Sequence, residues 1–141
     1  MGNTLTGQFS GGEAIECHVI PSDGTDTGPA GTASVNVNHP PEAEIAYIAP
    51  ADVSGPLTAA HYAHCITWQL SPDADGQPVT KTQTWEVNGV PVGPVNDLLP
   101  NTEFVAGDTV TCLGLWDDGI ESITDSYSVV VQNAPPTVTS V

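Results

Sequence analysis

Apolar and polar residues alternate along most of the chain, and the spacing of three or four residues that marks a helix is hard to find. A period of two is typical of β-strands with one buried face. The alternation is clearest in the last two predicted strands. The residues that it sends to the inner face are Val110, Cys112, Gly114 and Trp116, followed by Tyr127, Val129 and Val131.

Turn residues divide residues 40–135 into short apolar stretches. The predicted strands cover residues 44–48, 61–70, 79–87, 89–95, 98–104, 108–116 and 127–131. Asn88-Gly89 lies between two of them and predicts a type I′ hairpin turn, because both residue types tolerate positive φ. In the strand before this turn, Val79, Trp85 and Val87 share one face. The pattern predicts an all-β fold, an antiparallel β-sandwich.

Part of the sequence occurs twice, with an offset of 95 residues. The segment FSGGEAIEC at 9–17 returns as FVAGDTVTC at 104–112, and NHPP at 38–41 returns as NAPP at 133–136. This offset is too long for a solenoid repeat and fits tandem copies of a small domain.

The two copies are unequal, and this predicts the domain organisation. We expect residues 40–135 to form one complete sandwich, and residues 1–39 to be the last strands of a preceding one. Residues 136–141 would be the first strand of a following domain or an assembly segment. In the partial copy, the residues expected to face inward are Ile15, Cys17, Val19, Val35 and Val37.

The charge balance is extreme, with 17 acidic residues against one lysine and no arginine, which gives a net charge of −16. Binding to nucleic acid or to an anionic membrane surface is excluded, because nothing neutralises phosphate groups. No apolar stretch is long enough for a transmembrane helix. Two interpretations of the acidic residues stay open: a solvated, self-repelling surface, or a surface on which some carboxylates bind Ca²⁺.

Asp73 and Asp75 are the candidate Ca²⁺ ligands, because closely spaced carboxylates beside a glycine fit a hard cation. The segment lacks the downstream glutamate of an EF-hand, so a plain polar turn is the alternative. The segments 117–119 and 22–26 are interpreted as turns. No cofactor is required by anything in the sequence, and Ca²⁺ is the one considered.

Cys65, Trp85 and Cys112 fall on the second, third and sixth predicted strands of the complete unit. The order is similar to that of immunoglobulin domains, and the chain resembles the tandem Ig-like or PKD-like repeats of bacterial surface proteins. The resemblance rests on the segments HCIT at 64–67, DADG at 73–76, TWEVNG at 84–89, GDTVTC at 107–112 and NAPP at 133–136.

The resemblance implies a Cys65–Cys112 disulfide against a buried Trp85 in the core, with two buried thiols as the alternative. Trp116, Val110, Val129 and Val131 are expected in the same core. Cys17 corresponds to Cys112, and its equivalent partner would lie upstream of the sequence. It is therefore either bonded to a cysteine of another copy or a free thiol.

The second predicted strand departs from this scheme. Its large side chains lie on the face opposite Cys65: Tyr62, His64, Ile66, Trp68 and Leu70. Either a β-bulge intervenes or both faces of the strand are covered. Trp68 is then either an exposed platform for sugars or a residue covered by a neighbouring domain.

The resemblance implies a structural, non-catalytic module of an extracellular fibre, stalk or adhesin. Its partners would be other copies or flanking repeats, assembled head to tail with strand sharing. Whether the 141 residues are a whole subunit or an excerpt of a longer repeat protein stays open. The alternative function is a carbohydrate-binding or accessory module of a secreted protein. A row of exposed Trp or Tyr residues would favour that alternative, whereas burial of all three Trp would count against it.

Overall fold

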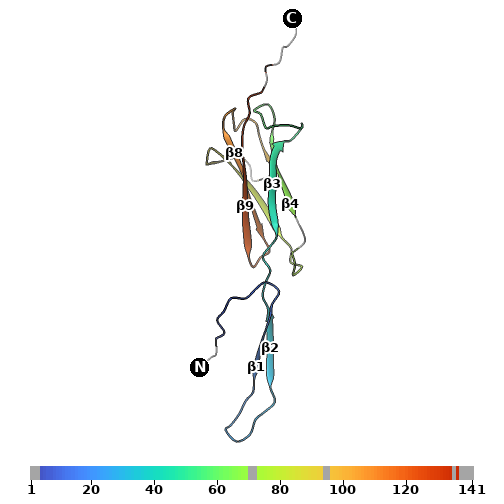
Figure 1. Ribbon diagram of the computed structural model, residues 1–141, viewed down its shortest axis with the longest axis vertical. Coiled ribbons are helices and arrows are strands. Elements are labelled where there is room, and N and C mark those ends of the chain that lie inside the picture. Colours follow the sequence, from blue (N-terminus) through green and yellow to red (C-terminus); the bar gives the residue numbers. More distant parts are fainter. Residues whose placement is uncertain (1–3, 70–72, 94–95, 135, 137–141) are drawn as a thin grey trace.

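The computed structural model describes residues 4–69, 73–93, 96–134 and 136. This part of the chain is all-β and contains no helix. Its strands are β1 (Ala14–Val19), β2 (Gly31–Asn36), β3 (Ala43–Pro50), β4 (Ala63–Gln69), β5 (Thr80–Val87), β6 (Val90–Val92), β7 (Leu98–Leu99), β8 (Thr109–Asp117) and β9 (Ser122–Val130). Strands β3 to β9 form a sandwich, and β1 and β2 form a separate hairpin beyond one end of it (Figure 1).

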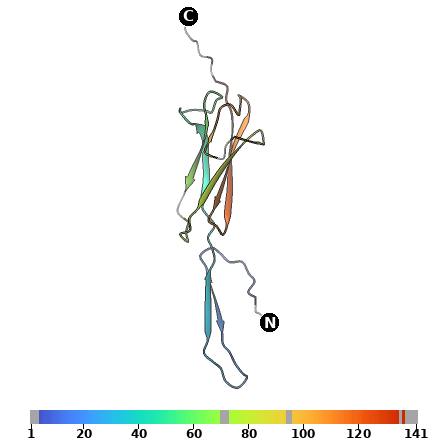
Figure 2. The same ribbon diagram turned by 180° about the vertical axis from the view of Figure 1, so that it is seen from behind.

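The sandwich has two antiparallel sheets that face each other. One has the strand order β3-β4-β7 and the other the order β6-β5-β8-β9. Figure 2 shows the same two layers from behind, with the hairpin and the sandwich along one long axis. The predicted turn between β5 and β6 is confirmed, since Asn88 and Gly89 have φ values of 52° and 78°. The two facing antiparallel sheets confirm the predicted all-β sandwich.

The core lies between the two sheets. Cys65 of β4 and Cys112 of β8 form a disulfide with their Cα atoms 6.2 Å apart, so it joins the two sheets. Trp85 is buried and stands opposite Cys112 in the neighbouring strand. The other predicted core residues are buried too: Val110, Trp116 and Val131 fully, and Val129 in part. The implied disulfide and core are thus confirmed.

Strand β8 shows how tightly this core is packed. Its even-numbered residues alternate inward as predicted, and Gly114 leaves room for the indole ring of Trp116. A Cβ atom at Gly114 would clash with that ring, so any side chain there would force the ring to shift. Tyr127 on β9 lies on the predicted inner face but is not fully buried. It pairs with Cys112, but β9 is an edge strand and 40% of the tyrosine is exposed.

The outer face of β4 is only partly covered, since His64 and Ile66 are half-buried and Trp68 is exposed, so the alternative in which both faces are covered is wrong. Ala63 and Cys65 point inward, whereas Tyr62, just before the strand, and Trp68 are 51% and 56% exposed. A bulge exists, but it lies in the partner strand β3, between Ile45 and Tyr47. Such a bulge re-aims the residues that follow it, and Tyr47 becomes an outward-facing residue. Leu70 lies outside the described residues.

The hairpin of β1 and β2 repeats the β8–β9 hairpin in its hydrogen bonds. The Gly12 N–H donates to the Val37 carbonyl at 2.8 Å, as the Gly107 N–H does to the Val131 carbonyl at 2.9 Å. In the connecting turns, one carboxylate oxygen accepts two backbone N–H groups. That carboxylate is Asp23 in the first hairpin and Asp118 in the second. The repeat found in the sequence therefore also exists in the local structure.

The inner face predicted for residues 1–39 is only half confirmed. Ile15 pairs with Val35, and Cys17 with Ala33, so these residues share a face of the hairpin. No described residues cover that face as the second sheet covers β8 and β9, and Val19 and Val35 are 59% and 63% exposed. Residues 137–141, predicted to begin a following strand, lie outside the described residues.

Candidate functional site

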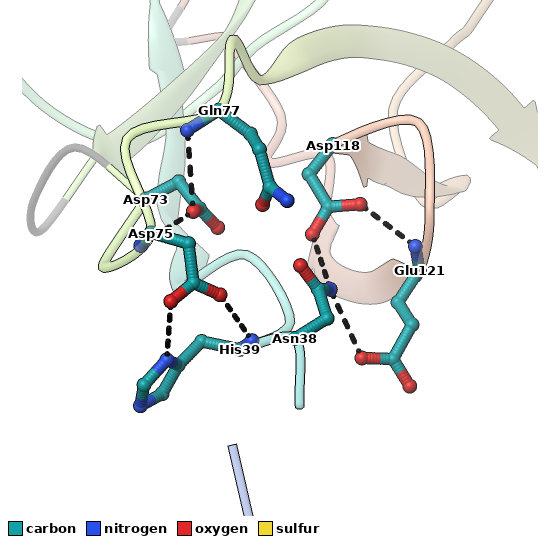
Figure 3. A network of polar contacts seen from close by, with 7 residues as sticks. All are labelled: Asn38, His39, Asp73, Asp75, Gln77, Asp118 and Glu121. Carbon is teal, nitrogen blue, oxygen red and sulfur yellow. Dashed lines mark hydrogen bonds and ion pairs between the residues drawn. The ribbon is translucent and has the colours of Figure 1, made fainter. Parts of the chain in front are cut away.

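The linker between hairpin and sandwich is held by two loops of the sandwich (Figure 3). The side-chain amide of Asn38 donates to Asp118 Oδ2 at 2.9 Å and to Glu121 Oε2 at 3.1 Å. The backbone N–H of His39 donates to Asp75 Oδ2 at 2.6 Å. His39 Nδ1 lies 3.0 Å from Asp75 Oδ1. We call these residues, together with Asp73 and Gln77, the junction cluster.

The loop that contains Asp73 and Asp75 folds around the first of these carboxylates. Asp73 Oδ1 accepts the backbone N–H of Asp75 at 2.9 Å and that of Gln77 at 3.4 Å. The Gly76 N–H donates to the Asp73 carbonyl at 2.9 Å, and Gly76 has a φ of 79°. Asp73 is only 6% exposed. The plain-turn interpretation accounts for Oδ1 of this buried carboxylate and leaves Oδ2 unexplained.

The second loop brings a carboxylate that sequence reasoning left as a turn residue. Asp118 Oδ1 accepts the backbone N–H groups of Ile120 and Glu121 at 2.7 Å each, and the residue is 6% exposed. Asn38, Gln77 and Glu121 were also not singled out. The sequence gives no sign that segments 80 residues apart meet.

Hydrogen bonds keep two junction carboxylates ionised. The backbone N–H of His39, followed by its side chain, lowers the pKa of Asp75 below its usual value. The side-chain amide of Asn38, followed by the N–H of Glu121, lowers the pKa of Asp118. A carboxylate that accepts donors favours its charged form. The linker is therefore tied to the sandwich by charge-assisted hydrogen bonds.

Carboxylates and imidazoles alone do not form a metal centre in the described ranges. No group of three or more His, Cys, Asp or Glu side chains is close enough to hold an ion there. Asp73 and Asp75, the predicted pair, have different roles. Asp75 holds the linker through both of its oxygens, whereas Asp73 organises its own loop. Any cation at this cluster would need amide oxygens as well.

A second feature is the outer face of the β3–β4 sheet. Three aromatic residues are exposed on or beside these strands: Tyr47 at 44%, Tyr62 at 51% and Trp68 at 56%. Tyr47 pairs with Ile66 across the two strands, and Trp68 pairs with Glu44. Trp85 and Trp116 are buried, so the three tryptophans divide between core and surface.

Two remaining observations bear on function. Cys17 is exposed and makes no disulfide within the chain. Within the described residues, no helix exists that could cross a membrane. Comparisons with protein-family models, curated proteins and solved structures found no match to this chain. A proposal on function therefore has to rest on the repeated hairpin, the junction cluster and the exposed aromatic face.

Proposed function

We propose that this protein is a structural module of an extracellular fibre, stalk or adhesin, in which successive β-sandwiches are joined in a row. The observation that carries the proposal is the repeated hairpin. β1 and β2 share with β8 and β9 both the turn hydrogen bonds and the pairing of apolar residues. In the first hairpin, however, the matching apolar face is exposed.

The exposed face is what an incomplete sandwich leaves behind. Val110 and Val129 pair across β8 and β9 against the core, and Ile15 and Val35 pair in the same way across β1 and β2. A two-stranded hairpin is marginally stable by itself in water, and it has unpaired edges that favour strand addition. In the assembled protein, strands of another copy or of a longer chain would supply the missing layer.

The disulfide and the charge support the proposed location. The Cys65–Cys112 bond joins the two sheets, and such structural disulfides persist in oxidising compartments. A net charge of −16 keeps a surface soluble in a medium rich in salt or cations. Both features support an extracellular or cell-surface module. Its partners would be other copies of the chain or flanking repeats.

Hydrogen exchange with mass spectrometry tests the proposal on two samples, the isolated 141-residue chain and the native material. We expect the amides of β1 and β2 to exchange fast in the isolated chain and to be protected in the native assembly. The amides of β8 and β9 serve as the internal control and should be protected in both. Equal protection of both hairpins in an isolated monomer would refute the proposal. The intact mass of the native material then separates short subunits from a longer chain.

One observation favours a second candidate function, the binding of carbohydrate. Tyr47, Tyr62 and Trp68 are exposed along one outer face, and aromatic rings offer sugars a flat apolar surface with polar edges. Affinity electrophoresis in polysaccharide gels would test this function. Retardation that Trp68→Ala abolishes would establish it, and Tyr127→Ala on β9 is the matched control. An unretarded wild type would count against carbohydrate binding at this face.

A further inference from the structure

Three buried oxygen atoms of the junction cluster have no hydrogen-bond donor. They are Asp73 Oδ2, Asn38 Oδ1 and Gln77 Oε1. Figure 3 shows these three side chains around a common space, which the carboxylate of Asp118 borders. A buried carboxylate oxygen without a partner is costly, because it has lost water and gained nothing in return. This arrangement requires a positive group or a donor in the space between them.

The neighbouring side chains do not supply that donor. The amide nitrogen of Asn38 is already bonded to Asp118 and Glu121. His39 pairs through Nδ1 with Asp75. The one lysine of the chain, Lys81, lies against the Thr67 hydroxyl at 3.3 Å. The cluster thus gathers negative charge and unpaired oxygen atoms in one place, and no cationic group of the described residues is directed into it.

We propose that the junction cluster binds Ca²⁺, with Asp73 Oδ2, Asn38 Oδ1 and Gln77 Oε1 as ligands and Asp118 beside them. Ca²⁺ takes six to eight oxygen ligands in flexible geometry and accepts carboxylates, amide oxygens and water together. Mg²⁺ demands a near-ideal octahedron and gives up its water reluctantly, so it fits this mixed set less well. Asp75 and Glu121 add negative charge nearby.

The ion would have a mechanical role. Asn38 belongs to the linker, whereas Asp73 and Gln77 belong to a loop of the sandwich. An ion bound by both parts restrains the hairpin relative to the sandwich. Ca²⁺ would then stiffen a row of such modules, and its removal would loosen each junction without unfolding either part. This inference is independent of how the apolar face of the hairpin is covered.

Calorimetric titration of the EDTA-treated chain with CaCl₂ at constant ionic strength tests the site. We expect one ion per chain with a dissociation constant of about 10⁻⁴ to 10⁻³ M, the range of extracellular modules. Absence of heat together with an unchanged melting temperature would overturn the proposal, since water would then fill the space. Equal affinity for Mg²⁺ would overturn the assignment of Ca²⁺.

Asp73→Asn is the most informative variant, because the asparagine keeps Oδ1 for the turn and replaces the bare oxygen by a donor. We expect its Ca²⁺ affinity to fall about tenfold or more, and its melting temperature in EDTA to be at least that of the wild type. Ca²⁺ binding at wild-type strength in this variant would overturn the site. A lower melting temperature in EDTA would show that Asp73 Oδ2 already has a hydrogen-bond partner in the wild type. That result would also count against the proposal.

A matched pair of turn variants controls for local structure. Asp118 and Asp23 make the same turn hydrogen bonds in the two hairpins, but only Asp118 borders the site. Asp118→Asn should weaken Ca²⁺ binding, and Asp23→Asn should not.

The mechanical role can be tested with a dye on Cys17, the free thiol, whose time-resolved anisotropy reports the motion of the hairpin. Ca²⁺ should slow the motion of the hairpin, and an unchanged decay would overturn the stiffening.

Discussion

The hairpin of β1 and β2 and the hairpin of β8 and β9 have the same local design and different surroundings. Their turns, their positive-φ glycines and their closing hydrogen bonds correspond. Yet Val110 in the second is fully buried, whereas its counterpart Ile15 in the first is half-buried and the strands around it are exposed. Local sequence specifies a hairpin in both places. In the part of the chain that the structure describes, only the second one has another sheet against its apolar face.

The residues that differ between the two hairpins show what burial requires. The sandwich has Gly114 and Trp116, a ring packed over a residue without a side chain. The corresponding positions of the first hairpin are Val19 and Pro21, which provide no such ring. The disulfide is the other difference, because Cys112 is bonded and Cys17 is not. Burial of a hairpin in this protein thus goes together with a packed aromatic ring and a disulfide to the opposite sheet.

Removal of the disulfide should give the largest difference in stability between changes in the sandwich and matching changes in the first hairpin. Replacement of Cys65 and Cys112 by alanine frees a segment with a sequence separation of 47 residues. We expect the free energy of unfolding to fall by about 4 kcal/mol in the chain-entropy model, as measured by urea titration. The counterpart change Cys17→Ser should alter stability by less than about 0.5 kcal/mol. Similar losses in both variants would contradict the difference drawn between the hairpins.

Truncation of paired apolar residues should give the next largest effect. Val110→Ala removes two methyl groups from a site with 0% exposure and should cost about 2 kcal/mol in urea unfolding. Ile15→Ala deletes more atoms in the hairpin but should cost less than about 0.5 kcal/mol in the isolated chain. In the native assembly, Ile15→Ala should weaken association. A large loss of unfolding free energy in the isolated chain would mean that the chain's own residues already cover this face.

An effect of similar or smaller size is expected from a methyl group placed under the indole ring of Trp116. Gly114→Ala places a methyl group 2.3 Å from a ring that is itself only 2% exposed. Overpacking of this kind costs about 1–3 kcal/mol, visible as a lower midpoint in urea. Val19→Ala at the corresponding position is the control and should be nearly neutral. A neutral Gly114→Ala would show that the core around Trp116 is looser than its contacts indicate.

The smallest effect concerns pH. The Val105 N–H, followed by the amide of Asn88, lowers the pKa of Asp108 below its usual value. A carboxylate with a lowered folded-state pKa contributes stability above its unfolded value and loses it as pH falls through the folded value. The stability difference between wild type and Asp108→Asn should therefore be larger at pH 7 than at about pH 2.5. Glu13→Gln, at the corresponding hairpin position, should leave sandwich unfolding unchanged at both pH values.

Much of the fold was predictable, because strand formation and tight turns depend on neighbouring residues. The alternation on β8 identified Val110, Cys112 and Trp116 as core residues, and Asn88-Gly89 identified a turn. The candidate site was predictable only in part. Asp73 was found from its spacing, but Asn38, which lies 80 residues from its partner Asp118, carried no local signal of contact.

The sequence by itself determined most of the strands and the repeated hairpin, since each depends on short-range pattern or on a repeat visible in the chain. The disulfide was implied by the resemblance of the Cys65, Trp85 and Cys112 order to that of immunoglobulin domains. Tertiary structure decided which apolar faces are buried. It turned Tyr47 outward through a bulge, left Tyr127 exposed at a sheet edge and gathered the oxygen atoms of the junction cluster. Burial and convergence depend on elements far apart in the chain, and a period of two marks an apolar face without showing what covers it.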